Sequence, residues 1–478
     1  MAQSNDPPRL IQIQHLNRKG RGVGSLQKTP TSPLTSVDVV GAVPGDTVLA
    51  LLGSKRRGRC QGQIQEIITP SPLRVFPKCI HVPVCGGCSL QQMDYSAQLK
   101  EKQAFIQTTF SSVISSHTEV RPIIPCQNPW QYRNKMEFSF SQNRAGERFL
   151  GLMIAGSKGK VLNLSECHLC SPWMIDLLSA VRLWWEGSGL EAYRMNDTGS
   201  LRTLIMREGI ATGDQMVMLT VSGNPDYALT QAHLKGFIQA LSQALPEEKQ
   251  KRLSVFLRIQ QIQKGSPTQF YEMHLHGPDH IIEKLQIQVQ EQVVDLQFKI
   301  SPTSFFQPNT LQAEKLYGAA LSLVPPCQHV LDLYAGTATL GLSMALRAKQ
   351  VTAVELNPAA VFDAESNKAL NGINNLELIC GDVGAALDRL VQEPHFTPPD
   401  LVIIDPPRCG LDPLAIAQIV GLKPPFILYI SCNPLSQAEN MKSFIEHGYQ
   451  VDVIQPVDQF PHTVHIENIV LLKCALFA

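Results

Sequence analysis

Reactive side chains are concentrated toward the C-terminus of the chain. Asp405 and Arg408 frame an Asp-Pro-Pro-Arg motif directly after an apolar run, and Cys432 follows the next apolar run in Ser-Cys-Asn-Pro. Glu467 ends the segment Phe-Pro-His-Thr-Val-His-Ile-Glu. A thiolate is a strong nucleophile, and a carboxylate can take a proton from a substrate. A lone cysteine is most often a small buried hydrophobe, but this setting favours Cys432 as a nucleophile.

These motifs need a scaffold that brings them together, and the surrounding sequence predicts a parallel sheet. From about residue 295, short apolar runs alternate with helix-length segments. Runs that are apolar on both faces suit a parallel sheet covered by helices. The expected strands are Val330–Leu333, Val351–Val354, Leu376–Ile379, Leu401–Ile404 and Phe426–Ile430. Because ligands bind at the carboxyl ends of such strands, Asp405 and Cys432 should lie at the same edge.

A glycine-containing turn after the first of these strands predicts a cofactor site. The segment runs Asp332-Leu-Tyr334-Ala-Gly336-Thr-Ala338 before a helix begins. Glycine lets a ligand approach the backbone, and a helix N-terminus offers N–H groups to a carboxylate. Ala338 breaks the G-x-G-x-x-G pattern, which argues against a dinucleotide. Acidic side chains that can bind ribose hydroxyls or the rest of the ligand end the next two strands; they are Glu355 and Asp382.

The chain has twelve cysteines. Because the sequence shows no signal peptide and no membrane-length apolar run, we expect a cytoplasmic protein, in which a disulfide framework is not expected. Cys79, Cys85 and Cys88 have the spacing C-x5-C-x2-C, and Cys167 or Cys170 could supply a fourth thiolate. Four thiolates can hold zinc or an iron–sulfur cluster. The spacing matches no common ferredoxin run, so it leaves both the metal and the fourth ligand open. A structural zinc ion, or no metal at all, is the alternative to a cluster.

The N-terminal part reads as a small barrel. Short strands broken by Gly and Pro are expected at Leu10–Leu16, Val37–Val40, Thr47–Leu52 and Gln61–Ile68. A helix should follow, from about Tyr95 to Phe110. The net charge is zero, which gives no support to a nucleic-acid partner, but basic residues are bunched. They are Arg18, Lys19 and Arg21, and then Lys55, Arg56, Arg57 and Arg59. A local basic face can bind phosphates in a neutral chain. The alternative interpretation is that both groups are solvated loops.

Targeting and membrane signals are absent from the sequence. The first residues have neither a basic start nor an apolar core, so no signal peptide is expected. No apolar run is long enough to span a bilayer. We therefore expect a cytoplasmic protein with no membrane partner and no obligate protein partner.

The motifs resemble those of the RNA uracil-5 methyltransferases. Asp-Pro-Pro-Arg, Ser-Cys-Asn-Pro, the segment that ends in Glu467, and Ser304-Phe-Phe-Gln307-Pro-Asn309 carry the resemblance, which covers nearly the whole chain. It implies a Rossmann-like class I methyltransferase domain and S-adenosylmethionine as methyl donor. Gln307 and Glu355 would hold the donor, together with the residues of the turn and strand ends: Tyr334, Gly336, Asp382 and Asp405. Cys409 departs from the family, which usually has Lys after Asp-Pro-Pro-Arg.

The chemistry of this family explains why these residue types are needed. Uracil C5 is a poor nucleophile until the Cys432 thiolate adds at C6 and makes C5 enolate-like. After methyl transfer, Glu467 would act as the base that removes the C5 proton. Asp405 would hold or polarise the uracil edge. His462 and His465 could assist, but a packed or surface role is the expected one for either. A base within folded RNA must be unstacked to reach Cys432.

The resemblance also implies partners for the remaining segments. Family members carry Cys…Cys-Gly-Gly-Cys followed by Gln and Tyr, which implies a 4Fe-4S cluster held by Cys79, Cys85, Cys88 and Cys167. Val43-Pro-Gly-Asp46 and its flanking strands look like a TRAM domain, an OB-like barrel that binds RNA. The expected domains are 1–70, the TRAM-like barrel; 71–290, a central α+β domain with the cluster; and 291–478, the methyltransferase domain. Family members that have both a TRAM domain and a cluster modify 23S ribosomal RNA, which favours that target over transfer RNA.

Three other functions are compatible with parts of the sequence. An amine-directed nucleic-acid or protein methyltransferase would use Asp-Pro-Pro but would need neither Cys432 nor Glu467. An iron–sulfur redox protein would turn over with an electron donor and without S-adenosylmethionine. A non-enzymatic RNA-binding protein would have no reason to retain Gln307, Glu355 and the catalytic set.

Overall fold

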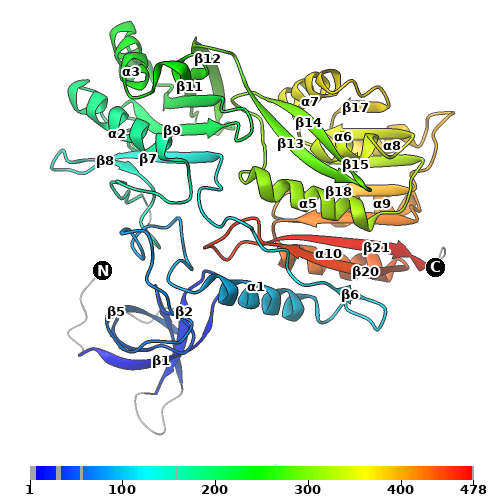
Figure 1. The fold of residues 1–478 in the computed structure, drawn as a ribbon, viewed down its shortest axis with the longest axis horizontal. Coiled ribbons are helices and arrows are strands. Elements are labelled where there is room, and N and C mark those ends of the chain that lie inside the picture. The colour runs from blue at the N-terminus through cyan, green and yellow to red at the C-terminus, as the bar shows by residue number, and fades with distance from the viewer. Residues whose placement is uncertain (1–6, 28–33, 54–57, 158, 264, 476–478) are drawn as a thin grey trace.

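Four β-sheet assemblies organise the chain in this computed structural model. It describes all residues except 1–6, 28–33, 54–57, 158, 264 and 476–478. Lys55, Arg56 and Arg57 of the second basic group therefore lie outside the described residues. The described part contains a closed barrel, a six-stranded sheet, a two-stranded hairpin and an eight-stranded sheet (Figure 1). None of its helices has the length and apolar character needed to cross a membrane.

The N-terminal strands close into a five-stranded barrel, which fits the expected OB-like fold. Its order is β1-β2-β3-β5-β4, with β1 Arg9–Leu16, β2 Gly22–Leu26, β3 Thr35–Val39, β4 Thr47–Leu52 and β5 Arg59–Thr69. Alternating residues of these strands point inward, and Ile11, Val37 and Val48 are fully or almost fully buried. Gly24 permits this packing, because a Cβ there would lie 2.4 Å from Cγ2 of Ile11.

The six-stranded sheet forms the upper left part of the molecule in Figure 1. Its order is β12-β11-β10-β9-β7-β8, with β7 Lys135–Gln142, β8 Arg148–Gly151, β9 Leu201–Glu208, β10 Gln215–Ser222, β11 Leu253–Gln261 and β12 Gln269–His276. Helices α2 Pro172–Gly187 and α3 Gln231–Gln243 cover one face, where Leu177 and Phe237 pack against Phe138 and Leu219. The short elements η1 Pro225–Tyr227 and α4 Glu247–Gln250 lie in the connections. The hairpin β13 Ile281–Val289 and β14 Gln292–Ile300 follows.

The C-terminal sheet has eight strands in the order β17-β16-β15-β18-β19-β21-β20-β6. Five are parallel, as predicted: β15 His329–Leu333, β16 Gln350–Glu355, β17 Leu376–Cys380, β18 Leu401–Ile404 and β19 Phe426–Ser431. Each extends at most one residue beyond its predicted end. β20 Tyr449–Val457 and β21 Glu467–Cys474 are antiparallel, and β6 Glu119–Val120 adds an edge.

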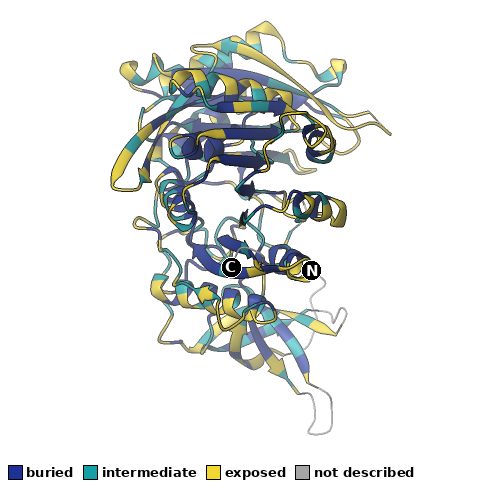
Figure 2. Ribbon diagram, turned by 90° about the vertical axis from the view of Figure 1, so that its right-hand side faces the viewer, coloured by how far each residue is buried: buried dark blue, intermediate teal, exposed yellow. Residues whose placement is uncertain are grey.

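Helices cover both faces of this sheet, which confirms the expected Rossmann-like α/β fold. α5 Thr310–Leu323, α6 Thr339–Ala345 and α7 Pro358–Leu370 pack on one face. α8 Val383–Leu390, α9 Pro413–Gly421, α10 Pro434–Glu446 and α1 Tyr95–Phe110 pack on the other. Figure 2 shows the strands buried between helices whose outer faces are exposed. The helix expected from Tyr95 to Phe110 is therefore present, and it packs on the C-terminal sheet although it comes early in the chain.

A buried ion pair fastens α1 to the segment between β20 and β21. Lys102 Nζ lies 2.5 Å from Asp458 Oδ1, and the two side chains are 3% and 0% exposed. Lys102 also donates to the carbonyl of Phe460, and the Tyr95 hydroxyl donates to the other oxygen of Asp458. Gln98 donates to Nδ1 of His462 and accepts from its backbone N–H. Each charge thus has several partners, which a buried pair requires.

Removing one partner of this pair should be strongly destabilising. Asp458→Asn would leave the Lys102 ammonium buried without its counter-charge, at an expected loss of about 3–5 kcal/mol in the free energy of unfolding. The matched control is Glu119→Gln, which breaks the exposed pair with Arg121 and should change stability by about 0–1 kcal/mol. Urea unfolding of both variants against the parent chain measures the difference. Equal midpoints for the two variants would contradict the importance of the buried pair.

Candidate active site

The predicted site residues converge on one edge of the C-terminal sheet. Tyr334, Glu355, Asp382 and Asp405 follow or end the parallel strands β15, β16, β17 and β18, so they share the carboxyl edge. Cys432 directly follows β19 at the same edge. The prediction that Asp405 and Cys432 share one sheet edge is confirmed, because the strands were recognisable from the sequence as buried and parallel.

Glu467 reaches this edge from the opposite direction. It begins β21, which runs antiparallel to β19, and Asn468 pairs with Ser431. Glu467 therefore stands beside Cys432, although the two are far apart in sequence. The side chain of Glu467 is 4% exposed. Burial and the neighbouring Asp405 raise its pKa well above the ordinary value, and Arg408 acts in the opposite direction.

The Cys432 thiol is half-buried and has charged neighbours of both signs. Burial raises its pKa, and so do Glu467 and Asp405, while Arg408 lies within hydrogen-bonding reach of the sulfur and lowers it. The Arg408 backbone is held in place, because its carbonyl accepts from Nδ2 of Asn433 at 2.7 Å and from the Ser436 hydroxyl. Arg408 is thus positioned to favour the thiolate, the reactive form of cysteine. Cys409, the departure from the family pattern, is exposed.

Asp405 and Asp332 are carboxyl groups that the site keeps from ionising easily. Burial raises the pKa of Asp405 to about 7. Burial also raises the pKa of Asp332 to about 7, although this side chain accepts a hydrogen bond from the Gly341 N–H. Tyr317, which the sequence did not single out, is buried close to Asp405 and Glu467. Its helical segment contained no motif that would have identified it.

The turn after β15 has the shape of a ligand-binding loop. Tyr334, Gly336 and Ala338 all have positive φ angles, of 61°, 59° and 56°, which places two non-glycine residues in the sparsely populated left-handed region. Glu355 ties this turn to β16, because its carboxylate accepts from the N–H of Gly336 at 2.9 Å and from the N–H of Asn357 at 2.7 Å. Asp382 is exposed and caps α8 through the Ala385 N–H.

Gln307 lies in the interior, next to the segment that precedes Glu467. Its side-chain oxygen accepts from Gln459 at 3.4 Å, and its backbone carbonyl accepts from Asn134. The Gln459 oxygen is buried without a hydrogen-bond partner among the described residues. Two buried polar amides are therefore side by side in the segment that precedes Glu467 and the one that precedes α5, and Gln459 is a neighbour that sequence reasoning missed. The adjoining Phe-Pro-His-Thr motif was the available signal.

The two histidines of this segment have structural surroundings. His462 is 4% exposed, stacks on Trp130 at 4.0 Å between ring centroids, and has a pKa lowered to about 4 by burial. Its backbone carbonyl accepts from the N–H groups of Ser89 and Leu90. His465 is exposed and borders the same cavity as Cys432. The packed role expected for His462 is confirmed.

A large basic cavity leads to the Cys432 thiol. It has a volume of about 1130 Å³ and lies between the barrel, α1 and the segments that follow β19 and precede β21. Its cationic walls come from the barrel side; they are Arg18, Lys19, Arg21 and Arg59. Lys102 of α1 also borders the cavity, but its charge is paired with Asp458. Asp38 and Glu101 are the acidic residues among its described walls. The first basic group of the sequence therefore faces the proposed nucleophile.

The four predicted cluster ligands border a second, smaller cavity. Cys79, Cys85, Cys88 and Cys167 all line a space of about 220 Å³, whereas Cys170 does not. Within the described residues, no group of three or more His, Cys, Asp or Glu side chains is arranged to hold a metal ion. The cysteines thus converge on one space, and a cluster there is not shown. This geometry distinguishes Cys167 from Cys170, which the spacing left open.

Comparison with known proteins identifies the family. The family model described as tRNA (uracil-5-)-methyltransferase matches residues 239–475. An uncharacterised RNA methyltransferase of Protochlamydia amoebophila is 48% identical over 441 residues, which cover 91% of this chain and 99% of the relative. One of Chlamydia trachomatis is 37% identical over 84% of this chain and 99% of its own length. The chain belongs to the RNA uracil-5 methyltransferase family.

A solved structure supports the fold. The crystal structure of the Pyrococcus abyssi tRNA (uracil-54, C5)-methyltransferase, in complex with S-adenosyl-L-homocysteine, matches with a TM-score of 0.70 and 24% identity. The match covers 97% of this chain and 100% of that one. As a member of the RNA uracil-5 methyltransferase family, the protein is an RNA methyltransferase. Family membership supports neither the amine-directed methyltransferase nor the iron–sulfur redox protein that the sequence left open.

The buried acids of the site should make stability depend on pH. A folded-state pKa of about 7 for Asp405, against an ordinary 3.8, means that the folded chain binds more protons than the unfolded chain between about pH 4 and pH 7. Stability should therefore fall as pH rises through this range. Asp405→Asn cannot ionise, so its stability relative to the parent should be higher at about pH 8 than at about pH 5.

Thermal unfolding at the two pH values measures this change. The control is Asp176→Asn, on the exposed side of α2, which should shift the midpoint equally at both. An Asp405→Asn effect that is independent of pH would show that burial of this carboxyl has no energetic consequence.

Proposed function

We propose that the protein methylates C5 of a uridine in RNA through a covalent adduct between Cys432 and C6 of the base. The observation that supports this most strongly is the pairing of β19 with β21, which sets Glu467 beside Cys432. Asp405, Arg408 and the turn at Gly336 lie at the same sheet edge. A nucleophile, a base and a donor-binding turn are thus within one site.

The proposed reaction balances at each step. The Cys432 thiolate forms a bond to C6, and the electron pair of the C5–C6 double bond shifts so that C5 can attack the sulfonium methyl. The methyl carbon–sulfur bond breaks, and S-adenosylhomocysteine is released. Glu467 then takes the C5 proton, the double bond re-forms, and the thiolate leaves. Asp405 holds the uracil edge, and its raised pKa lets the protonated form donate to a uracil carbonyl oxygen.

Arg408 and Glu467 have opposite effects on the pKa of the Cys432 thiol. These effects determine when Glu467 must be protonated during the reaction. Arg408 favours the thiolate and Glu467 disfavours it. A protonated Glu467 removes the opposing charge while Cys432 attacks, but proton removal from C5 requires the ionised carboxylate. Glu467 must therefore give its proton to solvent water after the thiolate has been consumed in the adduct, and only then can it take the C5 proton. Burial raises the pKa of Glu467 well above its ordinary value, which favours the protonated carboxyl group while Cys432 attacks.

The S-adenosylmethionine site is proposed from the same edge. Glu355 holds the turn at Gly336 and can accept from ribose hydroxyls with its remaining lone pairs. Tyr334 belongs to the turn itself, Asp382 and Asp405 follow β17 and β18 at the same sheet edge, and Gln307 would contribute its amide from the buried segment that precedes α5. The donor supplies a positively charged sulfonium methyl, which suits an edge that carries this many carboxyl groups.

The trapping of a fluorinated substrate tests the reaction. RNA transcribed with 5-fluorouridine should form a lasting adduct, because fluorine at C5 cannot be removed as a proton. We expect a shifted band on a denaturing gel that requires S-adenosylmethionine and disappears in Cys432→Ala. The matched control is Cys409→Ala, an exposed neighbour that should keep the band.

The outcome with different RNAs identifies the target. The proposed target is 23S ribosomal RNA, and transfer RNA is the second candidate. Transfer RNA stays a candidate because an enzyme named for tRNA matches 97% of this chain, barrel included. The presence of a barrel therefore does not distinguish an rRNA enzyme from a tRNA enzyme. If folded protein gives no shifted band with either RNA, the uracil-5 reaction is contradicted.

The RNA is proposed to enter through the basic cavity of about 1130 Å³. Its cationic walls suit a phosphate backbone, and its size admits an unstacked nucleotide. The barrel, proposed to be a TRAM domain of residues 1–70, would hold RNA mainly through phosphate contacts, with the segments 71–290 and 291–478 as the remaining domains. No aromatic residue precedes Phe76, so base stacking on the barrel contributes little.

We further propose that Cys79, Cys85, Cys88 and Cys167 hold a 4Fe-4S cluster. Four thiols around one cavity of about 220 Å³ are a suitable donor set, and a four-iron cluster needs its ligands further apart than a single ion does. Burial raises the pKa of Cys79 to about 11 and that of Cys88 to about 12. These thiols are therefore protonated without a metal, and loading must release protons.

The cluster assignment can be tested by its ligands. Protein purified without oxygen should contain iron and sulfide and absorb visible light, and Cys167→Ser should lose both. Cys170→Ser, which alters a cysteine outside the cavity, should keep the iron. If Cys170→Ser loses iron and Cys167→Ser keeps it, the fourth ligand is misassigned. Zinc in place of iron and sulfide would refute the cluster.

A further inference from the structure

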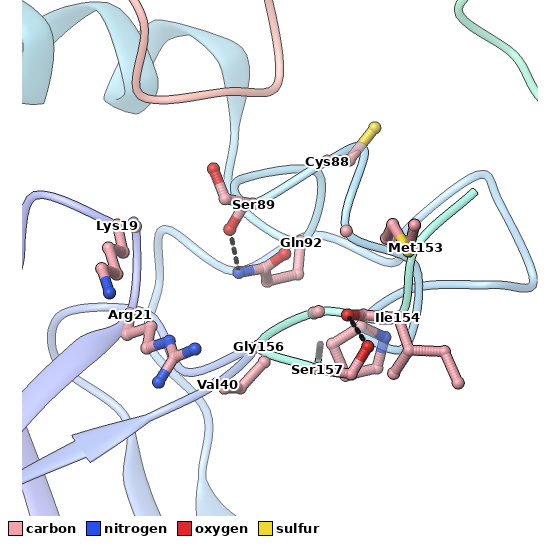
Figure 3. A pocket seen from close by; sticks show the side chains of 15 residues that line it. Lys19, Arg21, Val40, Cys88, Ser89, Gln92, Met153, Ile154, Gly156 and Ser157 are labelled. Carbon is pink, nitrogen blue, oxygen red and sulfur yellow. Dashed lines mark hydrogen bonds between the residues drawn. The ribbon is translucent and has the colours of Figure 1, made fainter. Parts of the chain in front are cut away.

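A third cavity lies where the barrel meets the cysteine loop, here defined as residues 77–93. It has a volume of about 390 Å³, within the usual range for a ligand pocket. Its walls come from three separate parts of the chain (Figure 3): the barrel, the cysteine loop and the turn 153–157 that follows β8. In Figure 3, Lys19 and Arg21 lie on one side, and Cys88 and Met153 on the other.

Lys19 and Arg21 connect this cavity to the active site. Both side chains line the third cavity and also the large basic cavity that contains Cys432. The two cavities are thus neighbours that share a cationic border. Arg21 lies against the turn, since a Cβ on Gly156 would be 2.7 Å from its Nη2. A chain of phosphates that leaves the Cys432 cavity would cross this border to reach the third cavity.

The chemistry of the walls suits a nucleotide. No acidic side chain is among the described lining residues, so the field favours an anion. Gln92 is 3% exposed and donates to the Ser89 carbonyl, which places a fixed amide in the wall. Met153 is 44% exposed, and its polarizable side chain can contact the face of a base. Phosphate, base edge and base face therefore each have a complementary group.

We propose that this cavity binds a nucleotide that flanks the target uridine, with its phosphate at Lys19 and Arg21. The inference rests on the proposed function and extends it to a second subsite. It gives the cysteine loop a direct role in substrate binding, because residues 86–92 form part of the wall. A loop held in shape by its cysteines would keep this subsite open, and no electron transfer is required.

Cross-linking from a trapped complex tests the location. The RNA that gives the adduct carries 5-fluorouridine at the target and one 4-thiouridine at a flanking position, moved one position at a time. After irradiation, peptides joined to the RNA are identified by mass spectrometry. We expect one flanking position to cross-link to residues that line only this cavity, such as Val40, Met153 or Ser157. An adduct whose flanking positions all cross-link elsewhere would overturn the subsite and leave the proposed reaction intact.

A filling substitution tests the binding energy independently of the adduct. Val40→Trp should occupy the cavity and raise KM for the RNA about tenfold with kcat little changed, as expected for the loss of one nucleotide contact. The matched control is Leu10→Trp, an exposed barrel position (59%) outside the cavities described. In filter binding, Val40→Trp should bind the RNA more weakly than Leu10→Trp. Equal affinity for Val40→Trp and Leu10→Trp would refute the subsite, whether or not methylation is observed.

Discussion

The buried pair of Lys102 and Asp458 joins parts of the chain that are 356 residues apart, and the catalytic arrangement depends on it. Desolvation makes two buried charges costly unless each has further hydrogen bonds, and here Tyr95 and the Phe460 carbonyl supply them. The pair therefore fixes where the chain turns before β21. Since β21 begins at Glu467, the position of the proposed base follows from a contact that contains no catalytic residue.

The same turning segment receives contacts from other parts of the molecule. The cysteine loop donates two backbone N–H groups to the His462 carbonyl, and the hydroxyl of Tyr132 donates to the Pro461 carbonyl. From the barrel side, a Cβ on Gly20 would lie 3.0 Å from Val464. Barrel, cysteine loop and α1 thus all meet the segment that leads to Glu467. A change in any of them alters catalysis through position, because none of these contacts touches the reacting atoms.

The elements that the sequence predicted well are those with a local signal. Five parallel strands and α1 were recognisable because apolar runs, glycine turns and polar helix starts are encoded by neighbouring residues. The edge that carries Asp405 and Cys432 followed from strand direction alone. Tyr317, Gln459 and the Lys102–Asp458 pair were missed, because their importance arises from partners that are distant in sequence. The position of α1 on the C-terminal sheet was missed for the same reason, since periodicity shows that a helix has a buried face and not which sheet covers it.

The electrostatics of the edge indicate what the site is prepared to bind. Asp332, Asp405 and Glu467 all have raised pKa values, and Arg408 is a positive charge that acts against this rise at Glu467. A ligand that brings positive charge stabilises the ionised form of such acids, and by linkage the ionised acids bind that ligand more tightly. A sulfonium donor meets this requirement, whereas a neutral uracil does not. This charge balance belongs to the sheet edge, so under the proposed function the choice of RNA falls to the side chains that line the basic cavities.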